Sequence, residues 1–390
     1  MRLFIEPTEP LLFRRTGKSF DAGESGYADT LFPPTPETMQ GAIRAAIATH
    51  WDRTKTLVEV FQQQELVDLI GDRSSYGRFR ITGIALGRRR KDGKIERLFT
   101  PPSHLLEVKG EDNKNWLIRL RPKPPKEEGI HTDLPESMQL VYPGENIEGK
   151  LESIGGWLTE QGLLKALRPG EVPTNEEMVS NHEIFEYESR LGIGMNNATK
   201  TTREGLLYQV RMVRMKHDKN FDYGFVVDIS LAQSSGSGEA ITSPAMSLDD
   251  DQTQKLLRLP DQGWVTLGGE RRAAHFEVLK SSDAIQRGDI EQAQRGNLLY
   301  LATPAAFKGG WRPEQWSASL TNPIAAAINR YQSIGGWSLR PGDSGGENKS
   351  MRRCVPAGSI YFFDKSVTVT QPLTDYGWQI GYGIAYAGEW

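Results

Sequence analysis

The segment from Glu188 to Met215, ESRLGIGMNNATKTTREGLLYQVRMVRM, gathers residue types that can hold a polyanion. Lysine and arginine neutralise phosphates, while hydroxyls and amides fix the register of a nucleic-acid backbone. From Arg190 to Lys219, seven basic residues stand against two acidic ones, a net charge of +5 within a chain of net charge −3. A local excess of this size attracts a polyanion and makes its binding sensitive to salt.

The glycines of this segment do not form a nucleotide-binding loop. A phosphate-binding P-loop needs Gly, four residues and then Gly-Lys-Ser/Thr, which GIGMNNATKTT lacks. Asn196 and Asn197 favour a turn with left-handed backbone, and Lys200, Thr201, Thr202 and Arg203 follow it. Two interpretations fit these residues: a turn that contacts a phosphodiester backbone, or a solvated turn between two core strands.

Three further basic clusters occur, and each one alone is typical of a solvated surface. They are Arg88 to Lys91, Arg271-Arg272 and Arg352-Arg353.

Catalytic patterns are absent from the sequence. The six histidines form neither His-x-x-x-His nor His-Glu-x-x-His, and the His217-Asp218 doublet lacks the further ligands that a metal-dependent phosphohydrolase needs. The single cysteine, Cys354, excludes an internal disulfide and a cysteine-based zinc site. His50 and His104 stay open as general bases for RNA cleavage, since histidine titrates near neutrality. The pattern favours a binding protein over an enzyme, with no metal and no cofactor.

Length and composition indicate a soluble protein of two domains. The chain has 390 residues, of which 37% are apolar and 25% charged. No apolar run is long enough to cross a bilayer, and the start of the sequence does not resemble a signal peptide, so we expect a cytoplasmic protein without membrane contact. Because the net charge is nearly neutral, any binding of nucleic acid must depend on local patches.

Strands interrupted by single helices predict an α+β fold. We expect a strand over residues 2–13, then a helix that Thr35 caps and Pro36 begins, and a second helix from Leu57 to Ile70. A half-buried strand is predicted over residues 78–86, and a hairpin whose turn is Gly268-Gly269.

Several stretches together resemble one family. They are EPLLFR, FPPTPETMQGAIRAAI, the Glu188–Met215 segment, WVTLGGERR, IGGWSL, RRCVPAGSIYFF and the terminal GYGIAYAGEW. They resemble the third subunit of the Cmr effector complex, a type III-B CRISPR protein of the RAMP superfamily that is related to subunits capping the 5′ end of the guide RNA. The resemblance spans essentially the whole chain.

The resemblance implies two ferredoxin-like (RRM-type) domains with hairpin and loop insertions, which we place at residues 1–175 and 176–390. It further implies a non-catalytic subunit that binds the 5′ handle of the CRISPR RNA and docks the large polymerase-domain subunit and backbone RAMP subunits. The glycine-rich C-terminus is similar to the RAMP glycine loop, where a bare backbone approaches RNA. Tyr382 and Tyr386 there either stack on bases or lie in the core.

The residues predicted to contact RNA combine the basic segment, the glycine turns and the capped helix. They are Thr35, Arg190, Gly192, Gly194, Asn196, Asn197, Lys200, Thr201, Thr202, Arg203, Gly268, Gly269, Arg271, Arg272, Gly381 and Gly383. Two alternatives stay open: a RAMP endoribonuclease that processes precursor CRISPR RNA with a histidine general base, and a scaffold that does not touch RNA.

Overall fold

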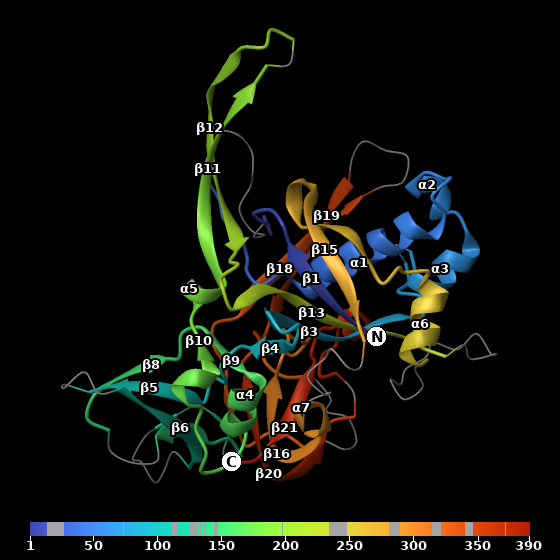
Figure 1. Cartoon of the computed structure of the whole chain (residues 1–390). Coiled ribbons are helices and arrows are strands. Elements are labelled where there is room, and N and C mark those ends of the chain that lie inside the picture. Colours follow the sequence, from blue (N-terminus) through green and yellow to red (C-terminus); the bar gives the residue numbers. More distant parts are fainter. Residues whose placement is uncertain are drawn as a thin grey trace.

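The structure is a computed structural model of the chain, shown in Figure 1. It describes residues 1–13, 27–72, 74–110, 115–124, 131–132, 134–135, 137–143, 147–196, 198–233, 248–280, 289–313, 321–339, 346–370 and 372–390.

The first long helix, α1 (Pro36–Trp51), begins where the sequence predicts. The Oγ1 atom of Thr35 accepts a hydrogen bond from the amide of Thr38, and Pro36 occupies the first turn, where its missing N–H is not needed. The predicted second helix is wrong as a single element: it is divided into α2 (Leu57–Val60) and α3 (Gln64–Ile70), the latter ending at Gly71. The capping box of Thr56 and Glu59 encloses only one turn, after which the chain bends.

An eight-stranded sheet forms the centre of the molecule, in the order β10-β9-β4-β3-β13-β1-β15-β14. Strand β1 lies between β13 and β15 and pairs antiparallel with both. Helix α1 and helix α6 (Asp250–Leu257) contribute to the same buried cluster as Leu3 and Ile5 of β1, so both cover one face of the sheet. The strands are β1 (Arg2–Pro7), β3 (Phe79–Arg90), β4 (Ile95–Phe99), β9 (Trp157–Thr159), β10 (Met178–Val179), β13 (Phe221–Leu231), β14 (Gln262–Leu267) and β15 (Arg272–Leu279).

A second, four-stranded antiparallel sheet is built from the C-terminal part of the chain, in the order β17-β20-β16-β21. Its core includes α4 (Glu160–Ala166) and α7 (Asp289–Gln292), through Leu163, Leu164 and Ile290. The strands are β16 (Arg295–Leu301), β17 (Ala325–Ala327), β20 (Ile360–Thr368) and β21 (Ala385–Gly388), and the short helix η4 (Trp378–Ile380) precedes β21.

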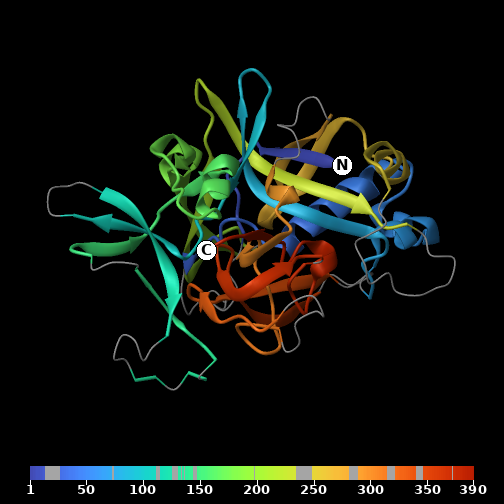
Figure 2. The same ribbon diagram turned by 90° about the horizontal axis from the view of Figure 1, so that it is seen from below.

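A third sheet extends from the side of the molecule, as Figure 2 shows. Its strand order is β7-β6-β5-β8. The strands are β5 (Leu105–Lys109), β6 (Asn115–Lys123), β7 (Leu140–Pro143) and β8 (Lys150–Ser153).

Two hairpins complete the fold. The longer, which we call the arm, consists of β11 (Phe185–Met195) and β12 (Thr202–Met215), with the short strand β2 (Tyr27–Ala28) beside its root and α5 (Asn181–Ile184) before it. The shorter hairpin pairs β18 (Gln332–Leu339) with β19 (Gly346–Cys354). The remaining elements are the short helices η2 (Asn175–Glu177) and η3 (Gly269–Arg271).

The mixed helices and antiparallel sheets confirm the predicted α+β class. The eight-stranded sheet takes strands from both sides of residue 175, since β13 and β15 flank β1. Within the described ranges, no helix is both long and apolar enough to span a membrane.

Candidate nucleic-acid interface

The arm carries most of the predicted RNA-binding residues and projects away from the body of the molecule (Figure 1). Its two strands pair from Phe185–Met215 at the root to Met195–Thr202 near the tip. Midway along the arm, Gln209 and Val210 pair with β2, and nearer the root Val213 pairs with Leu11. The sequence alone did not predict a projecting two-stranded element here.

One face of the arm exposes a row of large apolar side chains. Leu191 is 74% exposed, Leu207 62% and Ile193 53%. Ile193 and Leu207 are direct cross-strand partners, so their side chains share a face, and Leu191 lies two residues from Ile193 on that same face. Contiguous exposed apolar groups on a soluble protein mark interaction sites more often than chance.

On the opposite face of the arm, ion pairs with Glu188 neutralise part of the positive charge. Glu188 accepts from Arg190 at 2.6 Å and forms an ion pair with Arg214 at 2.5 Å. The hydrogen bond from Arg190, joined by that of Arg214, lowers the pKa of Glu188 below its usual value. The net charge of +5 was counted from Arg190 to Lys219 and therefore leaves out Glu188. Because Glu188 pairs with two of those arginines, less positive charge is available to a ligand than the count indicates.

The tip of the arm is a turn closed by its own hydrogen bonds. The amide of Asn196 donates to the carbonyl of Thr201 at 2.8 Å, and the side chain of Asn196 accepts from the Ala198 amide at 3.0 Å. Among the described residues of this turn, Lys200 has a left-handed backbone, with φ of 56°, and Asn196 does not. Asn197 lies outside the described residues. Lys200 is exposed at this tip, where it can approach a phosphate.

Other predicted residues of the arm belong to its strands. Gly192 faces Tyr208 across the hairpin, and an added Cβ would collide with the tyrosine ring, so the ring covers this glycine. Gly194 lies within β11 at the register irregularity between Ile193 and Met195. Thr202 and Arg203 begin β12.

The predicted hairpin turn at Gly268-Gly269 is present, between β14 and β15. Gly268 has φ of 75°, and a Cβ there would lie 2.6 Å from the Leu12 carbonyl oxygen. The amide of Gly269 donates to that same carbonyl at 2.7 Å. Because the two glycines have no side chains, the Leu12 carbonyl of the same chain packs directly against this turn. Of the two arginines that follow, Arg271 is exposed and Arg272 forms an ion pair with Glu270.

The glycines near the C-terminus also face protein. The missing Cβ of Gly381 would lie 3.0 Å from both Ile81 and Ile84, and that of Gly383 would collide with the Leu373 carbonyl. Tyr382 is buried beside them. Tyr386 packs edge-on against Phe99, at 6.1 Å between ring centroids.

The basic cluster at Arg88–Lys91 is largely neutralised by acidic residues far away in the sequence. Arg88 pairs with Glu96, and Lys91 with Asp222. Arg89 pairs with Glu6 and with Glu277. Arg88 to Arg90 belong to the end of strand β3.

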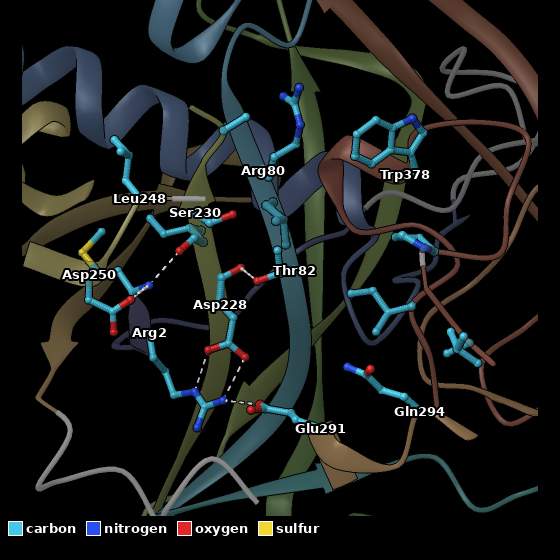
Figure 3. A pocket seen from close by; sticks show the side chains of 18 of the residues that line it. Arg2, Arg80, Thr82, Asp228, Ser230, Leu248, Asp250, Glu291, Gln294 and Trp378 are labelled. Carbon is cyan, nitrogen blue, oxygen red and sulfur yellow. Dashed lines mark hydrogen bonds and ion pairs between the residues drawn. The ribbon is translucent and has the colours of Figure 1, made fainter. Parts of the chain in front are cut away.

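A cleft of about 850 Å³ lies between the eight-stranded sheet and the C-terminal sheet (Figure 3). Arg80 and Trp378 face each other across it, with the guanidinium 5.2 Å from the ring. Arg2 lies deeper, bonded to Asp228 at 2.6 Å and to Glu291 at 2.8 Å. Arg2 is thus paired with Asp228 from the eight-stranded sheet and with Glu291 from α7. The deep part of the cleft therefore connects the two sheets through ion pairs.

Arg97 extends this charge cluster into the core. Its guanidinium donates to Glu160 at 2.9 Å and to Glu291 at 2.6 Å, and only 5% of its side chain is exposed. Burial raises the pKa of Glu160 despite the attraction of Arg97. For Asp228, burial acts upward, but the ion pair with Arg2 outweighs it and holds the pKa below its usual value.

The sequence matches one protein-family model along nearly its whole length. The family model described as CRISPR-associated protein (Cas_Cmr3) matches residues 3–390. The chain belongs to the Cas_Cmr3 family. This confirms the resemblance to the third Cmr subunit that the sequence motifs predict.

Solved structures similar to this Cas_Cmr3 family member are distant in sequence. One is a chain of the type III-B Cmr-beta bound to cognate target RNA, determined by cryo-EM. It shares 17% identity with a TM-score of 0.45 and covers 93% of this chain and 86% of that chain. A second, of Cmr-beta with cognate target RNA and AMPPnP, shares 16% identity with a TM-score of 0.42 over 93% and 86%. No curated protein matches.

The histidine candidates of this Cas_Cmr3 family member do not form a catalytic group among the described residues. His104 is buried against the Phe362 ring, and burial together with the Arg119 cation lowers its pKa to about 3. Partial burial and nearby Arg53 lower the pKa of His50. His104 is therefore enclosed in the core, with 1% of its surface exposed.

His217 approaches two carboxylates, at 3.3 Å from Asp222 and 3.6 Å from Glu6. Their ligand atoms lie within 4.8 Å of one another, as a metal site would require. Both carboxylates are already bonded to cations, Glu6 to Arg89 and Asp222 to Lys91. The group is therefore already part of an ion-pair network.

The exposed apolar row of the arm was missed by sequence reasoning. Its signal is the alternation of apolar residues with glycine in Leu191-Gly-Ile193-Gly-Met195. An alternating apolar pattern indicates a strand with one buried face. Here the apolar face is exposed, because the strand belongs to a projecting hairpin.

Proposed function

We propose that this chain is a non-catalytic RNA-binding subunit of a type III-B CRISPR effector complex. In this proposal the arm holds the 5′ handle of the CRISPR RNA, and the body docks the large polymerase-domain subunit and a backbone RAMP subunit. The observation that carries the proposal is the projecting arm, with its exposed apolar row and a lysine at its tip, in a chain that belongs to the Cas_Cmr3 family.

The arm would bind RNA through two kinds of contact. Lys200 neutralises a phosphate at the tip, where Thr201 supplies a hydroxyl and the turn supplies backbone amides. The apolar row of Leu191, Ile193 and Leu207 packs against exposed bases, which offer apolar faces in single-stranded RNA. Arg190 contributes less, because it is bonded to Glu188.

The glycine turns of the body have a different role in this proposal. Gly268, Gly269, Gly381 and Gly383 face protein atoms, so they shape the body that supports the arm. Arg271, exposed beside the first of these turns, remains a proposed RNA contact. Thr35 acts chiefly as a helix cap, since its hydroxyl is bonded to the Thr38 amide.

The strand orders support two ferredoxin-like units. In the first, β1, β3, β13 and β15 are arranged as β15-β1-β13-β3, with α1 and α6 in the two crossovers. This is the order 4-1-3-2 of a β-α-β-β-α-β unit. In the second, the order β21-β16-β20-β17 repeats 4-1-3-2. We therefore propose units at residues 1–279 and 289–390 in place of a boundary at residue 175.

The proposal is tested by RNA binding at several salt concentrations. Lys200→Ala combined with Arg203→Ala should weaken binding of a fluorescent repeat-derived handle RNA. It should also flatten the plot of log affinity against log salt, by about 0.7 for each phosphate of a single strand that is no longer neutralised. The matched control is Arg168→Ala with Lys365→Ala, which removes two exposed cations from the body. An arm variant that binds like the control at every salt concentration would contradict the proposal.

The apolar row has its own test. Leu191→Ser with Leu207→Ser should weaken RNA binding without changing the salt dependence, because no charge is altered.

The endoribonuclease alternative predicts specific cleavage of repeat RNA without metal, abolished by replacing one histidine. The scaffold alternative predicts no crosslink between the isolated subunit and guide RNA.

A further inference from the structure

The β18–β19 hairpin carries two adjacent arginines on opposite faces. Arg352 is the cross-strand partner of buried Ile334, and Arg353 is the partner of Ser333 on the outer face. Because neighbouring residues of a strand alternate between faces, the two arginines have different surroundings.

Arg352 anchors the hairpin to the body. Its guanidinium lies 3.6 Å from the centre of the Tyr376 ring, and the Tyr376 hydroxyl donates to Glu37 at 2.8 Å. Glu37 belongs to the first turn of α1. A register irregularity between Ile334 and Gly336 brings Lys349 opposite Gly336, on this same inner side. The inner face is therefore fixed against the helix, and the outer face has a defined orientation.

The outer face combines cations with exposed groups that stack. Arg353 lies over the ring of Tyr331 at 5.2 Å, and Tyr331 is 49% exposed. Met351 lies two residues from Arg353 on the same face and is 54% exposed, and Arg330, the neighbour of Tyr331 in the chain, is exposed as well.

The cations of this face differ from several other arginines that the sequence singles out. Within the part of the chain that the structure describes, no carboxylate forms an ion pair with Arg353 or Arg330. Arg88, Arg89 and Arg190, in contrast, are all paired with glutamates. Positive charge on the outer face of the hairpin is therefore available to an anion.

We propose that this outer face is a second binding surface for single-stranded RNA, separate from the arm. Arg353 and Arg330 neutralise phosphates, and the Tyr331 ring, already aligned by Arg353, stacks on a base, with Met351 beside it. An exposed aromatic ring beside cations that have no ion pair is the combination that single-stranded RNA binding uses, since a base stacks on the ring while the cations meet the phosphates. In Figure 1 the hairpin lies toward the same side of the molecule as the arm.

This inference rests on the RNA-binding role proposed above, and the two can fail separately. The test uses the full chain and a fluorescein-labelled, unstructured RNA probe, with anisotropy measured from low to physiological salt. Arg353→Ala should weaken binding and reduce the salt slope by about 0.7, the value for one neutralised phosphate of a single strand. Tyr331→Ala should weaken binding at least about fivefold with an unchanged slope.

Two control variants separate the loss of charge at Arg353 from the loss of any exposed arginine. Arg353→Lys keeps the charge and should retain the salt slope, and Arg295→Ala removes an exposed arginine from β16 and should bind normally. Normal binding by both Arg353→Ala and Tyr331→Ala, while the arm variants fail to bind RNA, overturns this inference and leaves the arm proposal intact. A defect of Arg353→Ala in partner-subunit association, with intact RNA binding, also overturns it, since the face would then dock protein. The reverse pattern, with arm variants normal and hairpin variants impaired, supports this surface and removes the arm.

Discussion

Replacing Arg97 with methionine should destabilise the folded chain by about 3–5 kcal/mol, the usual cost of breaking a buried ion pair by removing one partner. Arg97 bonds Glu160 at 2.9 Å and Glu291 at 2.6 Å, and its side chain is 5% exposed. Methionine fills similar length without charge, so Glu160 stays buried without its cation. The effect should be largest on the junction between the two sheets, where this cluster lies.

The stability change converts into a measurable shift of the melting temperature. Unfolding entropy of about 2.1 cal/mol/K per residue gives on the order of 0.8 kcal/mol/K for a chain of 390 residues. A decrease of about 3–5 kcal/mol then lowers Tm by about 4–6 °C. Differential scanning calorimetry or a fluorescence melt resolves a shift of this size.

The effect should also depend on pH with a definite sign. Burial raises the pKa of Glu160, and Arg97 partly offsets this, so the pKa of Glu160 in the variant rises further. A carboxyl with a raised folded-state pKa is favoured when protonated, and it loses stability as pH rises through that pKa. The destabilisation by Arg97→Met should therefore be greater at pH 8 than at pH 5.

Two controls separate this explanation from a general packing defect. Lys109→Met breaks an exposed ion pair with Glu152 and should leave Tm nearly unchanged. Adding Glu160→Gln to Arg97→Met removes the unpaired charge and should restore part of the stability. A Tm for Arg97→Met within one degree of the unaltered protein, or a destabilisation that is equal at pH 5 and pH 8, would refute the reasoning.

Three further predictions concern Gly268, His104 and Cys354. Gly268→Ala should cost about 1–3 kcal/mol, because φ of 75° is strained for alanine and its Cβ would collide with the Leu12 carbonyl; Gly93→Ala, at φ of 88° but in open space, should cost less in the same chemical denaturation. His104→Phe should reduce the loss of stability below pH 6, because a histidine with pKa of about 3 resists the protonation that the unfolded chain accepts; urea melts at pH 5 and pH 7 measure this. Burial raises the pKa of the Cys354 thiol to about 12, so a thiol reagent should label it only after unfolding, and rapid labelling of the native protein would contradict this.

Sequence patterns predicted elements whose causes are local. Thr35, Pro36 and Glu37 placed the start of α1 correctly, since capping and dipole effects act within one turn. The hairpin at Gly268-Gly269 was predicted correctly, although its loop continues to Arg271, since Leu267 pairs with Arg272. The family resemblance was also correct, because it depends on motifs spread along the whole chain.

The sequence could not show what lies opposite a residue from another part of the chain. The open side of Gly268 could face RNA or protein, and only the fold places Leu12 against it. Arg89 counted as free charge until the sheet brought Glu6 and Glu277 beside it. Local spacing predicts conformation, whereas partners of a charge or a glycine are set by long-range packing.

The position of β1 at the middle of the eight-stranded sheet affects how the protein can be made. The ribosome releases β1 early, but its neighbours β13 and β15 end only at residues 231 and 279. An apolar strand with both edges unpaired is prone to aggregate until its neighbouring strands have been synthesised. We therefore expect nascent chains shorter than about 280 residues to need chaperone protection.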